Sequence, residues 1–288
     1  MKTLCCDIET YSSIDLISSG VYRYCEAPDF QVLLFAYAWD DGPVEIVDLA
    51  SGEKIPEEVK RCLAIFQPNP HDRRPQLFEI PTLTAFNASF ERTCLSRHYA
   101  TPMNPAAWDC TMVRALSMGL PGNLDGVAKV LGLSEQKDKA GKTLINYFSK
   151  PCAPTRANNG RTRNLPKHDP AKWQLFKEYC KQDVEVERAV RKALAAYNPP
   201  EWERRLWALD QQINDRGVKI DRELVEQAIT IDLQHREKLT VEAIDLTGLQ
   251  NPNSRQQLIG WLEAAEGVEI EKLTKATVPD LIAGTGSD

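Results

Sequence analysis

The strand-like patterns of this chain all come before residue 111, and only helical patterns follow them. Runs rich in β-branched and aromatic residues predict five strands, Thr3–Glu9, Gln31–Trp39, Val44–Leu49, Thr82–Phe86 and Ala107–Cys110. The Asp41-Gly42 turn joins the second and third of them as a predicted hairpin. Strands that come early and helices that accumulate later predict an α/β fold, a mixed sheet with helices packed on it.

Helices are predicted between and after these strands. Apolar residues at helical spacing mark Pro56–Phe66, Ala88–Tyr99, Thr111–Ser117 and Leu124–Leu131, whereas Gln67–Pro81 is rich in proline and charge and predicts a loop. A longer helix is predicted to begin with Asp169 as N-cap and Pro170 at its first position, and to run towards Ala196.

The Asn198-Pro199-Pro200 segment is the predicted domain boundary. Beyond it the patterns are helical only, at Glu201–Asp215, Asp221–Leu246, Ser254–Ala265 and Thr277–Ile282. We therefore expect an α/β domain over residues 1–198 and an all-α segment over residues 199–288. Because the last helical piece stops at Gly-Thr-Gly-Ser-Asp, we expect this segment to be incomplete and the chain to be a fragment or a truncated reading frame.

Composition narrows the class of protein. The formal net charge of −6 argues against a uniformly basic nucleic-acid binder but allows a local basic groove. The eight cysteines form no CxxC pair, which argues against a structural zinc site and suits reduced, buried thiols. There is no run of about 18 apolar residues and no secretory signal pattern, so we expect no membrane partner and a cytoplasmic location.

Carboxylates stand at the end of the first predicted strand. Asp7 and Glu9 are two residues apart, so they point to the same face of that strand. Two neighbouring carboxylates repel each other unless a positive charge lies between them, and oxygen ligands suit Mg²⁺ or Mn²⁺. The alternative is that the strand ends in solvent, where acids are common.

Two further acids occur beside apolar residues. Asn87 ends a strand, and Glu91 lies in the first turn of the next helix, where the helix dipole favours a carboxylate. Tyr179 and Asp183 are four residues apart and share one face of the long helix with Phe176. Each acid alone has a simpler explanation, a charge preference at a helix start or an acid at the rim of a helix.

Taken together, Asp-x-Glu, Asn-x-x-Phe-acid and Tyr-x-x-x-Asp occur in the order of the three motifs of the DEDD exonuclease superfamily. The chain resembles its tyrosine subclass, since the histidine subclass would need His at the position of Glu178. The resemblance implies a ribonuclease H-like fold that gathers Asp7, Glu9, Glu91 and Asp183 around two divalent cations, Mg²⁺ or Mn²⁺.

The same resemblance implies roles for these residues. Asp7 and Asp183 would bind metal most directly, Glu9 would complete the ligand set, and Tyr179 would hold the attacking water by its hydroxyl. The implied reaction is hydrolysis of phosphodiesters from a 3′ end, releasing 5′-mononucleotides. One residue departs from the family pattern, because Glu91 stands where the family usually has Asp. The extra methylene moves that carboxylate by more than about 1 Å, a scale to which metal sites are sensitive.

Later segments extend the resemblance. Asn214–Asp221 and Asn251–Leu258 resemble segments at the start of the polymerase region of family A DNA polymerases, where a helical thumb begins. The chain looks most like the phage and prophage branch of that family. The palm and fingers motifs are absent from these 288 residues, so we expect a missing polymerase region as partner and no DNA synthesis by this chain alone. An unrelated helical appendage is the alternative.

Candidate contacts to a single-stranded or frayed 3′ DNA end are Asn87, Phe90, Asp109 and Lys142. Lys142 belongs to a basic segment, Gln136–Lys167, which has eight Lys and Arg against the single acid Asp138. Such cations suit phosphate contacts, although a solvated loop has the same composition. Phe90 is suited either to stacking on a terminal base or to the core.

Three further features are interpreted separately. Ala140-Gly141-Lys142-Thr143 hints at a phosphate-binding P-loop, but the earlier glycine that this motif requires is Gln136, so we reject that assignment. Asp109 is expected to support the site. Arg92 is expected to be a solvated helix charge.

Two other functions remain open at this point. A ribonuclease D-like RNA-processing enzyme shares the tyrosine-type motif but would lack the thumb-like segments. A catalytically weakened nuclease domain that only scaffolds a polymerase is favoured by Glu91, whereas the intact Asp7, Glu9, Tyr179 and Asp183 speak against it.

Overall fold

The computed structural model describes residues 2–64, 81–134 and 141–285. The chain forms two compact units, Met1–Gly217 and Val218–Asp288. Helix α8 (Glu201–Arg216) thus belongs to the first unit by its contacts, although it follows the predicted boundary at Asn198. The compact units divide the chain between residues 217 and 218 by their contacts. The domain boundary between residues 198 and 199 stays a prediction.

A five-stranded mixed sheet forms the centre of the first unit. Its strands are β1 (Thr3–Tyr11), β2 (Gln31–Trp39), β3 (Glu45–Asp48), β4 (Thr82–Ala85) and β5 (Trp108–Cys110). They are ordered β3-β2-β1-β4-β5, with β1 antiparallel to β2 and parallel to β4. This sheet and the helices that flank it confirm the α/β class, and the antiparallel β2–β3 pair confirms the hairpin predicted around Asp41-Gly42.

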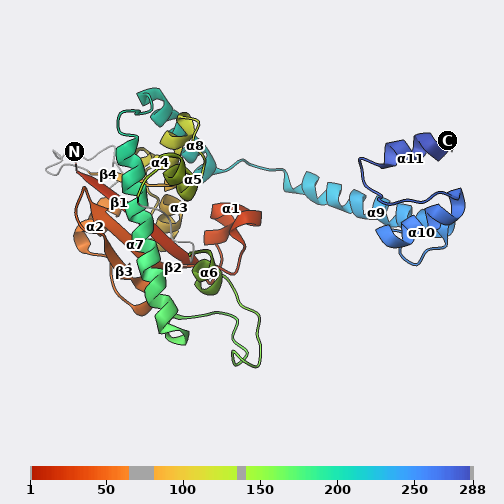
Figure 1. The fold of residues 1–288 in the computed structure, drawn as a ribbon, viewed down its shortest axis with the longest axis horizontal. Coiled ribbons are helices and arrows are strands. Elements are labelled where there is room, and N and C mark those ends of the chain that lie inside the picture. Colours follow the sequence, from red (N-terminus) through yellow and green to blue (C-terminus); the bar gives the residue numbers. More distant parts are fainter. Residues whose placement is uncertain (1, 65–80, 135–140, 286–288) are drawn as a thin grey trace. The chain divides into compact units, whose positions relative to one another are not determined.

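Helices cover both faces of this sheet (Figure 1). The first unit contains α1 (Leu16–Cys25), α2 (Glu57–Ala64), α3 (Ala88–His98), α4 (Thr111–Ser117), α5 (Leu124–Val130), α6 (Gly141–Phe148), α7 (Pro170–Ala193) and α8. Short 3₁₀ turns lie at Leu49–Ser51, Pro105–Ala107 and Pro166–His168. Helices α1 and α6 were not predicted from the sequence, and the predicted loop Gln67–Pro81 lies almost wholly outside the described residues.

The central strand β1 is buried on both faces, and its side chains alternate between two apolar layers. Leu4, Cys6 and Ile8 belong to a core that also contains residues of α3. Cys5 and Tyr11 belong to a second core, which is built with α6 and α7. The face of β1 that turns towards α7 therefore carries the odd-numbered residues, and Asp7 and Glu9 are among them.

Helix α7 begins as predicted. Asp169 is its N-cap and accepts a hydrogen bond from the Lys172 amide at 3.0 Å, and Pro170 occupies the first helical position. Its buried face includes Trp173, Phe176 and Tyr179, and these aromatic rings pack against the second core. This packing holds the helix against β1 and β2.

In its described residues, 218–285, the second unit contains helices joined by short loops and no strand. It consists of α9 (Arg222–Thr247), α10 (Arg255–Glu266) and α11 (Val278–Thr285). Asp221 and Ser254 cap the starts of α9 and α10, and Gly248 and Gly267 end them in the left-handed conformation. These helices confirm the predicted all-α segment.

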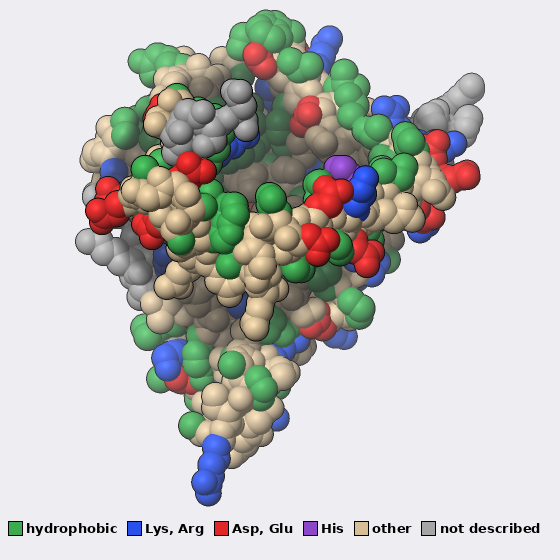
Figure 2. All heavy atoms as spheres, turned by 90° about the vertical axis from the view of Figure 1, so that its right-hand side faces the viewer, with side chains coloured by type: hydrophobic (Ala, Val, Ile, Leu, Met, Phe, Trp, Pro, Cys, Tyr) green, Lys and Arg blue, Asp and Glu red, His purple; other side chains and the backbone are tan. Residues whose placement is uncertain are grey.

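Many large apolar side chains of α9 are exposed, and none of its residues is buried. Figure 2 likewise shows hydrophobic side chains at the surface, among acidic and basic ones. None of the described helices has the length and apolar character that a membrane crossing requires.

Candidate metal centre

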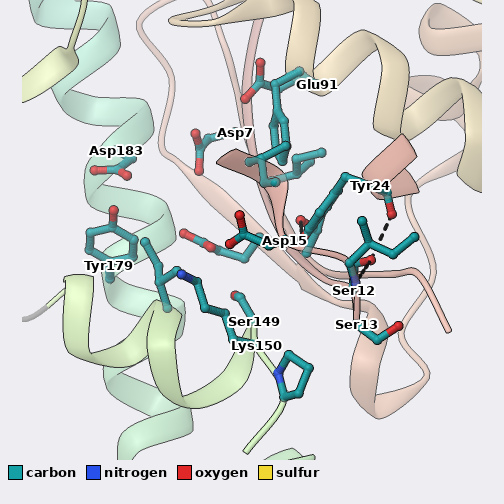
Figure 3. Close-up of a pocket in the computed structure, with 18 residues that line it drawn as sticks. Asp7, Ser12, Ser13, Asp15, Tyr24, Glu91, Ser149, Lys150, Tyr179 and Asp183 are labelled. Atoms are coloured by element: carbon teal, nitrogen blue, oxygen red, sulfur yellow. Dashed lines mark hydrogen bonds between the residues drawn. The ribbon is translucent and has the colours of Figure 1, made fainter. Parts of the chain in front are cut away.

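Three of the predicted acids converge between β1 and α7. Asp7 and Glu9 on the strand and Asp183 on the helix each offer a carboxylate oxygen, and these oxygens lie within 4.8 Å of one another. Glu9 and Asp183 are buried, and Asp7 is half-buried. Figure 3 shows Asp7 and Asp183 turned towards each other across the pocket.

The convergence follows from how a strand and a helix repeat. Side chains at i and i+2 of a strand lie roughly 6.7 Å apart, and those at j and j+4 of a helix lie about 6 Å apart, so the two rows stay in step over several residues. The Cys5 thiol contacts Glu187, and the Cys180 thiol lies 3.7 Å from Oδ2 of Asp7. Strand β1 and helix α7 therefore run in opposite directions, so that Cys5 lies near Glu187 and Asp7 lies near Cys180.

Glu91 comes to the same cavity from the other layer. It lies in the first turn of α3 and is 5% exposed, and it lines the cavity with Asp7, Tyr179 and Asp183. It lies outside the cluster of three acids described above. Figure 3 places it beside Asp7, across the pocket from α7.

Tyr179 lies beneath the carboxylates and is 1% exposed. Its side chain hydrogen-bonds Asp183, and its ring stacks on Phe176 with centroids 6.2 Å apart. Burial, followed by the charges of Asp183, Glu9 and Asp7, raises the pKa of the Tyr179 hydroxyl well above its ordinary value. The hydroxyl therefore keeps its proton and acts as a hydrogen-bond donor.

The cavity itself measures about 290 Å³. Its walls combine the acids with apolar side chains, including Ile8, Tyr24, Phe90 and Ile145. Asp15, Ser149 and Lys150 also line it, and the sequence analysis did not single out any of these three as site residues. Asp15 is the N-cap of α1 and accepts a hydrogen bond from the Ser18 amide. The Asp-x-x-Ser pattern in the sequence could have indicated this helix start. Lys150 belongs to the predicted basic segment, which was its only signal in the sequence. For Ser149 we find no such signal, because its place just after α6 brings it to the cavity.

Of the four residues predicted to contact DNA, only Phe90 lines the cavity. Phe90 lines the cavity and also packs near Tyr24, at 6.2 Å between ring centroids. Asn87 is exposed at the start of α3, and Lys142 is exposed on α6 outside the cavity wall. Asp109 lies on β5, forms a 2.7 Å ion pair with Arg114 and lines a separate small hollow.

The expectation that Arg92 is a solvated helix charge is wrong. Its side chain is 2% exposed, and its two terminal nitrogens each donate to the Asp215 carboxylate at 2.8 Å. The guanidinium also donates to the Met103 carbonyl, and the Tyr22 hydroxyl donates to Asp215. The error arose because the partner lies 123 residues further along the chain, on α8.

The cluster of three acids fits a hard divalent cation. Carboxylate oxygens held this close repel one another, and a cation between them removes that repulsion. Oxygen-only ligands suit Mg²⁺ or Mn²⁺ better than softer metals. The eight cysteines are all free and six are buried, and neither Cys5 nor Cys180 belongs to the cluster.

This chain has structural neighbours and a sequence relative among known proteins. No family model matches it. A nuclease solved in its apo form shares 16% identity over 76% of this chain and 89% of its own, with a TM-score of 0.46. The POL domain of Pol1 from M. smegmatis, in complex with DNA primer-template and dNTP, shares 15% identity over 99% of this chain and 42% of its own, with a TM-score of 0.47. Likeness at this level says nothing about activity.

A sequence relative is much closer than these two structures. The DNA polymerase of Bacillus phage SP02 is 54% identical over 288 residues, which is 100% of this chain and 42% of that protein. The chain is therefore a relative of a phage DNA polymerase along its whole length, and it spans about two fifths of that polymerase.

Proposed function

We propose that this chain is a metal-dependent 3′–5′ exonuclease, with a ribonuclease H-like first unit, that proofreads for a family A DNA polymerase. One observation carries the proposal most of all, namely the convergence of Asp7, Glu9 and Asp183 within 4.8 Å beside Tyr179. These residues come from both ends of the first unit, and nothing in their packing alone requires three acids to share a buried pocket.

The residues in the pocket suggest a distinct role for each in the proposed reaction. Asp7 and Asp183 would hold the cations from opposite sides, with Glu9 as a further ligand and Glu91 reaching towards them from α3. Two bound Mg²⁺ or Mn²⁺ ions would lower the pKa of the attacking water and stabilise the leaving 3′ oxygen. The protonated hydroxyl of Tyr179 would orient that water, and the apolar walls at Tyr24 and Phe90 would accept the terminal nucleotide.

The segment from Gly141 to His168, which brings Lys150 to the pocket, suits contacts to a nucleic acid backbone. The sequence from Gly141 to His168 contains no acid, and Lys150 lines the cavity itself. Arg161 and Arg163 are held by Asn164 and by Gln31 and Tyr11, whereas Lys142, Lys150, Arg156 and Lys167 are exposed. Exposed cations of this kind bind phosphates without reading sequence. The remaining part of the predicted basic segment, residues 136–140, lies outside the described residues.

The second unit supports the assignment to DNA rather than RNA. Its relative is a DNA polymerase, and we propose that α9 is the start of the helical thumb. Leu224, Ile231, Leu233 and Leu246 of this helix are 59% to 76% exposed. Exposed apolar side chains in such number mark a surface that packs against another element. We propose the palm and fingers of the longer polymerase as that partner, acting in the cytoplasm of a bacterial or phage-infected cell.

A digest of a 3′-labelled DNA oligonucleotide with Mg²⁺ or Mn²⁺ tests the proposed activity. We expect stepwise shortening from the 3′ end, abolished by chelator and by Asp7→Ala. Shortening that survives both treatments would exclude this site as its source. An RNA oligonucleotide in parallel tests the ribonuclease D-like alternative, which requires the RNA to be degraded faster than the DNA.

Titration with Mn²⁺ separates an active enzyme from a scaffold. A competent site should bind two ions, and Asp183→Asn should weaken both. Absence of measurable binding in the unmodified protein would favour the scaffold, which Glu91 in place of Asp makes a specific alternative.

A further inference from the structure

The first residue of α6 lies directly against the ring of Tyr179. Gly141 is buried, and a Cβ atom built on it would lie 2.1 Å from Cε2, 2.6 Å from Cζ and 2.7 Å from Cδ2 of that ring. Among the other described glycines the tightest such contact is 2.9 Å, at Gly126. Any side chain at position 141 would therefore collide with the edge of the ring next to the hydroxyl.

The ring has little room to move away. Its flat face stacks on Phe176 at an interplanar angle of 6°, and Phe176 in turn stacks on Phe148 at the other end of α6. The hydroxyl end is held by the hydrogen bond with Asp183. Figure 3 shows this hydroxyl directed at Asp183. Helix α6 thus contacts the aromatic stack at both of its ends.

We propose that Gly141 is a positioning residue for Tyr179, and that the missing side chain at this position sets where the tyrosine hydroxyl lies relative to Asp7, Glu9 and Asp183. The expected fall in kcat rests on the proposed exonuclease function. The expected fall in melting temperature rests on the packing of Gly141 against the ring alone. This packing also explains the glycine of the Gly141-Lys142-Thr143 sequence, which was rejected above as a phosphate-binding loop. The glycine here serves close packing.

At an ordinary helix start, replacing glycine by alanine is expected to stabilise the protein, because glycine loses more backbone freedom on folding. At position 141 the added methyl must push the ring back by more than an ångström to reach a normal contact distance. A displacement of about 1 Å at reacting groups can lower a rate by roughly 100-fold.

The kinetic experiment compares Gly141→Ala with Thr143→Ala, an exposed position on the same helix. With the labelled oligonucleotide and Mg²⁺, we expect kcat of Gly141→Ala to fall about 10- to 100-fold with KM changed less than about 3-fold. Thr143→Ala should leave both constants unchanged. Full kcat in Gly141→Ala would overturn the proposal.

A double-mutant cycle shows whether the effect passes through the hydroxyl. In a Tyr179→Phe background the hydroxyl is already absent, so adding Gly141→Ala should lower kcat by less than about 3-fold further. A second fall as large as the first would show that Gly141 acts by another route, and would overturn the positioning role.

A stability cycle needs no nuclease activity. Gly141→Ala should lower the melting temperature of the full chain, and in a Tyr179→Ala background, where the ring is gone, the same change should leave it equal or raise it. The coupling supports the contact even if no exonuclease activity is found, which would reject the proposed function alone. If Gly141→Ala fails to fold, recovery of folding by Tyr179→Ala supports the contact, and failure to recover overturns it.

Discussion

The thiol of Cys5 on β1 donates a hydrogen bond of 2.5 Å to Oε2 of Glu187 on α7. The same carboxylate accepts a 2.5 Å hydrogen bond from Thr111 at the start of α4. Cys5 lies two residues before Asp7 on the same face of β1, and Glu187 lies one helical turn after Asp183. This buried contact therefore holds the register between strand and helix that brings the candidate metal ligands together.

Glu187 gives stability a specific pH dependence. Burial is the main cause that raises its pKa above 4.5, and the hydrogen bonds from Cys5 and Thr111 oppose the rise. Because the folded state then holds this proton more tightly than the unfolded chain, the group's contribution is full below about pH 4.5 and declines as the pH rises through its folded pKa. We expect the unfolding free energy of the wild type minus that of Glu187→Gln to fall as the pH rises from 4 upwards. A difference that stays flat up to pH 8 would contradict the raised pKa.

Replacing Asp7 by Asn separates function from stability. The loss of a ligand should lower exonuclease kcat by more than about 100-fold, which exceeds the usual effect of losing a residue that only supports a ligand. In metal-free protein the same change removes like-charge repulsion, so the melting temperature should rise, by about 2–4 °C for each 1 kcal/mol gained. Calorimetry with chelator checks the second outcome. A lower melting temperature there would mean that Asp7 is not repelled by its neighbours.

Tyr179→Phe should lower the rate and leave Mn²⁺ binding nearly unchanged, because the ring and its stacking on Phe176 remain while the hydroxyl is lost. One positioned hydrogen bond is worth about 1 kcal/mol or more, so we expect at least a 5-fold fall in kcat. Since the pKa of this hydroxyl is raised well above its ordinary value, the wild-type rate should not decline between pH 9 and 10.5 through tyrosine ionisation. Loss of Mn²⁺ binding in Tyr179→Phe would refute the assigned role.

Two substitutions at Glu91 separate its charge from its length. Glu91→Gln keeps the shape of this buried side chain and removes its charge, so we expect kcat to fall about 10-fold or more and Mn²⁺ binding to weaken. Glu91→Asp keeps the charge and withdraws it, and we expect a smaller fall. A large gain in kcat for Glu91→Asp would instead show that the glutamate weakens the natural site.

The Arg92–Asp215 pair should stabilise the packing of α8 on α3 within the first unit. Asp215→Ala leaves the guanidinium buried without its carboxylate, which costs about 1–3 kcal/mol after allowance for the 36% exposure of the Asp215 side chain. Arg205→Ala breaks an exposed pair with Glu201 on the same helix and should change stability by less than about 0.5 kcal/mol. Chemical denaturation of both variants measures the contrast. Equal effects would mean that the buried pair contributes nothing special.

The sequence by itself determined the secondary structure wherever the pattern was local. Gln31–Trp39 is a strand with the predicted bounds, and the cap at Asp169 begins α7 as predicted, because apolar runs and capping side chains act within a few residues. The order of the acidic motifs also pointed to the carboxylates that meet in the pocket. Helix α1 was missed, since it carries Gly20 at a φ of 75° and two serines that obscure its apolar face.

Only the tertiary structure decided which side chains share an environment. Arg92 pairs with Asp215 on α8, and Gly141 lies against the ring of Tyr179, and neither contact follows from the neighbouring sequence. Asp109, which was expected to support the site, forms an ion pair with Arg114. Burial, ion pairing and close approach depend on residues far away in sequence, and local patterns carry no information about them. The register between β1 and α7 is such a long-range property, and it alone turns separate acids into one site.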